Sequence, residues 1–180
     1  GKLSSMSPEV QAEASAACIA RLSSAVEDER ASAAAALRPI KAKDLVAKAL
    51  PALNKALSDA SPGVRYEAAH TLAKLDPENA APAVPALIET LGPPGVQDSD
   101  TRDKAARDLH TLAKHCAGHV PALARGLGDS SAMVRIELLG ALAALGPAAK
   151  DARAAIETCT PDASEDVQRE AKKALAALGN

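Results

Sequence analysis

The sequence has almost no aromatic residues: Tyr66 is the one aromatic side chain among 180 residues, and Phe and Trp are absent. Strands draw on aromatic and β-branched side chains to fill their pleated faces, so this composition argues against an all-β fold. The hydrophobic fraction is nevertheless 47%, and Ala and Leu supply most of it. Because alanine is the strongest helix former, the composition indicates an all-α protein.

The sequence also lacks a strong net charge and long apolar runs, and its number of cysteines is odd. The formal net charge is −2, so no strong electrostatic field points to nucleic acid or to an anionic membrane surface. No run of 18 apolar residues is present, so we expect no membrane insertion. The three cysteines, Cys18, Cys116 and Cys159, are scattered along the chain, which favours free thiols and a reducing, cytoplasmic location.

The first ten residues, GKLSSMSPEV, contain neither an initiator Met nor an apolar segment. A secretory signal peptide needs such an apolar segment, so this stretch does not resemble one. We therefore expect the chain to be one domain cut from a larger protein.

What the sequence does contain is an internal repeat. Five segments align, at 29–40, 64–75, 101–112, 134–145 and 167–178, and their starts lie 35, 37, 33 and 33 residues apart. Each segment has Ala or Leu four residues after its first residue, Leu after eight, and Leu or Ile after eleven. Steps of four, four and three residues place these side chains on one helix face. The repeat therefore predicts five helices, each with one buried stripe.

A further helix is expected before each of these segments. LPALNKAL (50–57), VPALIETL (84–91) and VPALARGL (120–127) each carry Pro at the second position, where its missing N–H is not needed. The first and last units lack this Pro, so we expect their first helices to start at Pro8 and Pro147. Pro51 is open to a second interpretation, a kink in a helix that begins after Asp44.

Short polar residues occupy the turn between the paired helices. Three residues before the first residue of the aligned segments at 64, 101, 134 and 167 stand Ser61, Asp98, Ser131 and Ser164. Their side-chain oxygens suit an N-cap, which accepts one of the orphan N–H groups of the first turn. Val26 holds this position in the first unit and cannot cap, so we expect Asp28 to cap that helix from a shifted start.

The combined pattern is D-x-S-x-x-V-R-x-E-A-A-x-x-L-x-x-L after V-P-A-L-x-x-x-L. It resembles HEAT repeats, and more closely the short bacterial-type HEAT-like repeats of phycobilin lyases, over about residues 15–179. The resemblance implies an all-α, right-handed α-solenoid, an α-α superhelix, of about five helix-turn-helix repeats. We expect a single domain over 1–180, with units at about 7–40, 41–76, 77–113, 114–146 and 147–180.

In HEAT proteins, Asp and Arg residues in these turns link neighbouring repeats as a ladder. The resemblance implies this structural role for Asp59, Arg65, Arg102, Asp129, Arg135 and Asp162. The first unit has Arg30 at the arginine position, and the last unit has Gln168 there. A row of arginines that binds an anionic ligand is the alternative interpretation.

The resemblance also implies that the second helices line a concave face, where a protein partner would bind. Away from the buried stripe, the second and third units are richest in polar side chains. The partner-binding candidates are Tyr66, Glu67, His70, Lys74, Lys104, Arg107 and Asp108. Tyr and Arg are frequent interface anchors, although Tyr66 as a lone surface residue is the alternative. We expect a non-catalytic protein-interaction scaffold with a protein partner, no nucleic acid and no small-molecule substrate.

No catalytic or cofactor motif of the G-x-x-x-x-G-K-[ST], G-x-S-x-G or C-x-x-C type is present, so we expect no catalytic residue and no cofactor. His115, Cys116 and His119 are weak metal-ligand candidates within HTLAKHCAGH. A helix-to-helix turn must fall there, with Gly118 as terminator, and it would spread the three side chains. An accessory subunit of an enzyme such as a bilin lyase, or a metal- or cofactor-binding module, remains the alternative function.

The third unit carries an insertion, GPPGVQDSD at 92–100. Its Pro and Gly content predicts an exposed, stiffened loop. Insertions in repeat arrays fall in loops along one edge, often a binding edge. A harmless insertion is the alternative interpretation.

Overall fold

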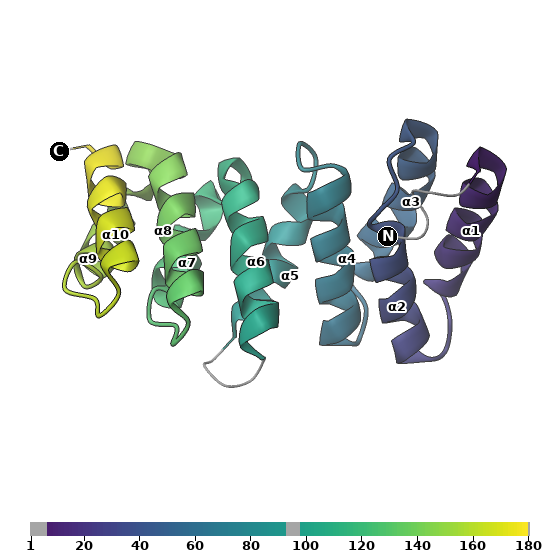
Figure 1. The fold of residues 1–180 in the computed structure, drawn as a ribbon, viewed down its shortest axis with the longest axis horizontal. Coiled ribbons are helices and arrows are strands. Elements are labelled where there is room, and N and C mark those ends of the chain that lie inside the picture. Colours follow the sequence, from purple (N-terminus) through teal and green to yellow (C-terminus); the bar gives the residue numbers. More distant parts are fainter. Residues whose placement is uncertain (1–6, 93–97, 180) are drawn as a thin grey trace. The chain divides into compact units, whose positions relative to one another are not determined.

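A computed structural model describes residues 7–92 and 98–179, so the predictions for the first six residues and for 93–97 of the insertion lie outside the described residues. The described residues form helices joined by short turns, with no strand (Figure 1). Their contacts divide the chain into two compact units, 1–86 and 87–180, and the division falls within α5 (Val84–Leu91). The single continuous domain expected from the sequence stays a prediction.

The first unit holds two helix pairs. It contains α1 (Pro8–Arg21), α2 (Glu27–Leu37), α3 (Lys43–Ala56), α4 (Pro62–Leu75) and a short 3₁₀ turn, Ala81–Ala83. Helix α1 packs against α2, and α3 packs against α4. The second helices of the two pairs, α2 and α4, also pack against each other, and α1 contacts α3 (Figure 1). Each pair is therefore one repeat stacked on the next.

The second unit continues the same arrangement. Its helices after α5 are α6 (Ser99–Thr111), α7 (Val120–Gly126), α8 (Ala132–Leu145), α9 (Arg153–Glu157) and α10 (Glu165–Ala177), with 3₁₀ turns at Ala113–His115, Ala117–His119 and Gly146–Ala152. The second helices stack in the order α6, α8, α10, and α7 packs against both α8 and α9. The all-α fold of α-solenoid type is confirmed.

The predicted stripes form the core. The leucines eight residues into the first four second-helix segments, Leu37, Leu72, Leu109 and Leu142, are 0 to 3% exposed. Four residues earlier, Ala occupies the stripe in every unit except the fourth, which has Leu138. Small side chains let helices approach closely, and burial of the leucines supplies the hydrophobic stabilisation.

Three of the four predicted N-caps make the expected hydrogen bond. The side chains of Ser61, Asp98 and Ser131 accept from the backbone N–H three residues later, at 3.4, 2.9 and 3.4 Å. Ser164 is the N-cap residue of α10, but its side chain makes no capping bond. The prediction that Asp28 caps the first unit's second helix is wrong, because α2 begins at Glu27 with Val26 as its N-cap.

Two prolines do not start their first helices: for Pro51 the second interpretation, a helix already begun near Asp44, is the one that holds, and for Pro147 the predicted start is wrong. Helix α3 begins at Lys43, so Pro51 lies inside the helix rather than at its start. In the last unit, Pro147 falls in the 3₁₀ turn Gly146–Ala152, and regular α-helix begins only at Arg153. Gly146 ends α8 with a φ of +55°, a conformation that favours glycine.

One segment, Ala132–Glu157, is long and apolar enough by length and composition to cross a membrane. It does not form one continuous helix, because α8, the 3₁₀ turn after Gly146 and α9 divide it. Its large apolar side chains Leu138, Leu142 and Ile156 are fully buried. These three side chains therefore belong to the core of the second unit.

Candidate functional site

Arginines of one repeat bind aspartates of the next. Arg30, Arg102 and Arg135 each donate from Nε and Nη2 to the two carboxylate oxygens of Asp59, Asp129 and Asp162, respectively. The distances are 2.7 and 2.9 Å for the first pair, 2.8 and 3.1 Å for the second, and 2.8 and 2.8 Å for the third. Bidentate geometry of this kind fixes orientation as well as distance.

These pairs shift the ionisation of their members. Hydrogen bonds from Arg30 and Arg135 lower the pKa of the Asp59 and Asp162 carboxyl groups. The hydrogen bond to Asp129 raises the pKa of Arg102. The Arg102–Asp129 pair is the most buried of the three, with side chains 4 and 5% exposed.

Each of these aspartates also anchors the turn before the second helix of its own repeat. Asp59, Asp129 and Asp162 accept a hydrogen bond from the backbone N–H two residues later, at 2.9, 2.8 and 2.8 Å. One carboxylate therefore joins a helix start to the preceding repeat. The arginine side chains are occupied by these contacts, which disfavours the alternative of an anion-binding row.

Arg65 plays a related part within its own repeat. Its Nη1 donates to the backbone oxygens of Asp59 and Ala60 at 2.7 and 2.9 Å. Gln168, which replaces the arginine in the last unit, donates from Nε2 to the backbone oxygen of Asp162 at 2.7 Å. In the next unit after Arg65, the sequence has Val96 at the position that is Asp in three of the other turns.

The structure corrects the exposure expected for three of the partner-binding candidates. Tyr66, His70 and Asp108 are buried, at 9, 8 and 0% exposure. The Tyr66 and His70 rings stack within α4, with centroids 5.6 Å apart and planes 5° apart. The sequence prediction counted only the three-residue stripe as covered, but stacking also covers the flanks of a second helix. These three side chains are not surface anchors.

The other four candidates reach the surface: Lys74, Lys104 and Arg107 are exposed and Glu67 is half-buried. Glu67 of α4 pairs with Arg38 at the end of α2. Glu137, at the corresponding position of α8, binds Arg107 Nε at 3.3 Å and lies 2.8 Å from His110 Nδ1. These ion pairs were not predicted from the sequence, because their members lie on different repeats.

The His110 ring packs against Gly140, where the absence of a side chain leaves room for it. A Cβ at Gly140 would lie 2.5 Å from His110 Cε1 and 2.8 Å from Nε2. The imidazole of α6 therefore lies directly against the backbone of α8. His110 remains 45% exposed there, beside the exposed guanidinium of Arg107. A mixed-charge surface thus runs from α6 to α8 in the second unit.

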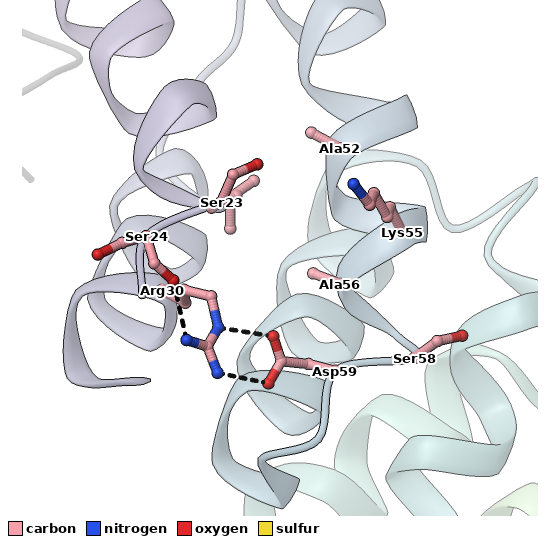
Figure 2. A pocket seen from close by; sticks show the side chains of 9 residues that line it. Ser23, Ser24, Arg30, Ala52, Lys55, Ala56, Ser58 and Asp59 are labelled. Atoms are coloured by element: carbon pink, nitrogen blue, oxygen red, sulfur yellow. Dashed lines mark hydrogen bonds and ion pairs between the residues drawn. The ribbon is translucent and has the colours of Figure 1, made fainter. Parts of the chain in front are cut away.

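A groove of about 330 Å³ lies in the first unit, between the α1–α2 turn and the end of α3. Figure 2 shows Ala52 and Lys55 of α3 facing Ser23 across it, with the Arg30–Asp59 pair at one end. Arg30 Nη1 also donates to the backbone oxygen of Ser24 at 2.9 Å. Most of the polar groups at this end are therefore engaged in holding the repeats together.

The weak metal-ligand candidates do not gather into a site. Cys116 is buried, and its Sγ donates to the Leu112 oxygen at 3.4 Å. Burial raises the pKa of this thiol to about 11, which disfavours the thiolate that a metal needs. His115 and His119 are half-buried. Across residues 7–92 and 98–179, no group of three or more His, Cys, Asp or Glu side chains is arranged to hold a metal ion.

Stacked helical repeats held by arginine–aspartate pairs define a repeat protein of the α-solenoid class. The family described as HEAT repeats matches residues 2–97, more than half of the chain. The chain belongs to the HEAT repeat family. No curated protein matches its sequence.

Solved structures share the fold. An engineered protein is 24% identical with a TM-score of 0.70, and the match covers 92% of this chain and 79% of that one. A computationally designed armadillo repeat protein for modular peptide recognition is 22% identical with a TM-score of 0.70, covering 93 and 83%. The complex of CpcE and CpcF of phycocyanin lyase from Nostoc sp. PCC7120 is 27% identical with a TM-score of 0.61, covering 92 and 65%.

Proposed function

We propose that this protein is a non-catalytic interaction scaffold that binds a protein partner on the surface of its second helices. Repeat folds of this family are typical of protein-interaction scaffolds, and an armadillo repeat relative in fold was designed for peptide recognition. The observation that carries the proposal is the mixed-charge surface of α6 and α8, formed by Lys104, Arg107, His110 and Glu137.

This surface suits recognition better than catalysis. Its charged groups come from two stacked helices, and rim charges of both signs select partners and steer association. Arg107 and His110 stay 51 and 45% exposed although both contact Glu137, so a carboxylate of a partner can approach them from the solvent side while Glu137 keeps its place. By the HEAT resemblance this surface belongs to the concave face. The free thiols of Cys18, Cys116 and Cys159 support the accompanying proposal of a reducing, cytoplasmic compartment.

The proposal is tested by cross-linking the tagged protein to its partners and mapping the cross-links by mass spectrometry. We expect the double variant Lys104→Glu, Arg107→Glu to lose partners that wild type captures. Arg125→Glu combined with Lys150→Glu changes net charge equally in the same unit but away from the second helices, and should retain them. Equal capture by both variants, or cross-links confined to the first helices, would show that the second-helix surface does not bind.

A second candidate function is an accessory subunit of an enzyme of the bilin-lyase kind. The likeness to the CpcE–CpcF complex of phycocyanin lyase supports it. Under this candidate, the purified protein should shift the visible absorbance spectrum of an added bilin. An unchanged spectrum at a bilin concentration well above that of the protein argues against the candidate and leaves the scaffold proposal intact.

A further inference from the structure

The first unit has a second groove, separate from the second-helix surface of α6 and α8. It has a volume of about 370 Å³ and lies where the start of α3 meets the end of α4. The residues that line it are Ile40, Lys41, Lys43, Val46, Ala47, Leu50, Lys74, Leu75 and Asp76. Aliphatic and basic side chains therefore share one concave site.

The floor of this groove is aliphatic. Ile40 is 4% exposed, and Val46, Leu50 and Leu75 are half-buried. Ala47 is exposed and small, which keeps the groove open on the α3 side. The half-buried side chains leave apolar area in water that an aliphatic side chain from a partner would cover.

The rim of the groove is basic. Its lining holds three lysines against one aspartate. Asp76 is engaged, because Asn79 Nδ2 lies 3.1 and 3.0 Å from its two carboxylate oxygens. Lys41 and Lys43 are exposed, and within the described residues neither forms an ion pair. The neighbouring segment 41–48 adds Lys48 and a single acid, Asp44.

We propose that this groove binds an acidic peptide segment of the partner protein. One aliphatic side chain of the segment packs on Val46 and Leu50, and flanking carboxylates lie beside Lys41 and Lys43. The charge of the rim selects an acidic segment over a basic one. Nucleic acid fits less well, because the lining offers no aromatic ring on which a base could stack. This inference rests on the proposed function only in taking the partner to be a protein.

The test uses the full chain labelled with ¹⁵N and the peptide acetyl-Glu-Glu-Leu-Glu-Glu-amide as probe. We expect the probe to shift amide resonances of residues 40–50 and 74–76 in two-dimensional NMR spectra. Lys41→Glu combined with Lys43→Glu should weaken binding about ten-fold, since two attractions become repulsions. Both positions are exposed, and acidic residues are favourable at a helix start, so this variant should fold.

Three controls separate the groove from general charge attraction. Lys150→Glu combined with Lys172→Glu alters the net charge equally and should bind the probe as wild type does. Ala47→Glu places a carboxylate in the groove and should weaken binding, whereas Ala47→Gln, of the same size, should weaken it less. Replacing the probe's Leu by Ser should also weaken binding, because the aliphatic floor is then left exposed.

The inference is overturned if the probe shifts no groove resonance at millimolar concentration, if both charge-reversal variants bind equally, or if the Ser probe binds as well as the Leu probe. None of these results bears on α6 and α8. Partner capture that depends on Lys104 and Arg107 would still support the scaffold function. If instead the groove binds the probe but partner capture does not depend on Lys104 and Arg107, the second-helix proposal fails and the groove inference stands.

Discussion

Gly126 of α7 lies against Leu138 of α8, so closely that a Cβ at Gly126 would collide with Leu138 Cδ1. The corresponding positions in the preceding first helices are Ala56 and Thr90, and these repeats have Ala on the second-helix stripe instead of Leu138. In the fourth repeat the side chain on the second helix is therefore larger (Leu138 in place of Ala), and the facing residue on the first helix is smaller (Gly126 in place of Ala or Thr). Close packing of this kind links the two positions energetically.

We expect Gly126→Ala to lower the free energy of unfolding by up to about 2 kcal/mol. Helix propensity alone would favour alanine by up to about 1 kcal/mol, but overpacking against fully buried Leu138 costs about 1–3 kcal/mol. Urea denaturation followed by circular dichroism measures the difference. Gly118→Ala is the matched control, because a Cβ there meets nothing within 4 Å, and it should be neutral or slightly stabilising.

The contact between Gly126 and Leu138 also predicts that the effects of substitutions at the two positions on the free energy of unfolding are not additive. Leu138→Ala alone should cost about 2–5 kcal/mol through the cavity it leaves. The double variant Gly126→Ala, Leu138→Ala restores the combination of small residues found in the second repeat, so it should cost less than the sum of the two single changes. Strict additivity in the urea titration would show that the two side-chain positions do not compete for space.

The Arg102–Asp129 pair should be the most sensitive of the three interrepeat pairs. Asp129→Asn keeps the shape but leaves a guanidinium that is 4% exposed without its counter-charge. Breaking a buried pair in this way costs about 3 kcal/mol or more. Asp100→Asn removes the exposed partner of Lys104 and should cost under about 1 kcal/mol. Chemical denaturation measures the free energy of unfolding of both variants. Equal losses of stability would mean that burial does not set the strength of these ion pairs.

Stability should fall in acid because of Asp59 and Asp162, whose folded-state pKa values are lowered by Arg30 and Arg135. The unfolded carboxyl groups titrate near about 3.9, so their stabilising contribution is complete above that pH. It is lost as the pH falls from there through the lower folded-state pKa, because the unfolded state then binds more protons. The melting temperature should drop steeply between about pH 4.5 and pH 2.5.

The double variant Asp59→Asn, Asp162→Asn provides the comparison for this pH dependence. It should melt lower than wild type at pH 7, with a shallower decline in acid, since the two groups no longer titrate. Thermal melts at constant ionic strength measure both curves. Parallel curves would assign the acid sensitivity to other carboxyl groups, such as the helix cap Asp98, whose pKa is also lowered by hydrogen bonds from Thr101.

The fold was predictable because its signals are local and periodic. Steps of four, four and three residues place Leu72 and Leu109 on a buried face, and the aspartate and arginine positions recur at fixed distances from it. The start of α3 was not predictable from the proline rule alone, since eight helical residues precede Pro51, and Leu45 and Ala49 among them are buried. Tertiary contacts routinely override such propensities.

The candidate site was less predictable, because burial depends on neighbours that the repeat pattern does not specify. The pattern located Lys104 and Arg107 on the surface, but it also placed Asp108 there, which is 0% exposed. It gave no sign that His110 and Arg107 would meet Glu137 from the next repeat. Glu67 and Glu137 occupy the same position in their repeats, but the second helix between them has Lys104 there, so the pattern is not continuous along the sequence.

The three thiols should differ sharply in reactivity. Cys116 and Cys159 are 0 and 3% exposed, whereas Cys18 is half-buried. Burial raises the pKa of all three, to about 11 for Cys116, and the thiolate is the reactive form. With a disulfide reagent such as DTNB at pH 8, we expect one thiol to react in the folded protein and three in urea. Cys18→Ser should remove the reaction of the folded protein with DTNB, and Cys116→Ser should leave it unchanged. A fast reaction of the folded protein that survives Cys18→Ser would mean that the core around Cys116 or Cys159 opens on the time scale of the assay.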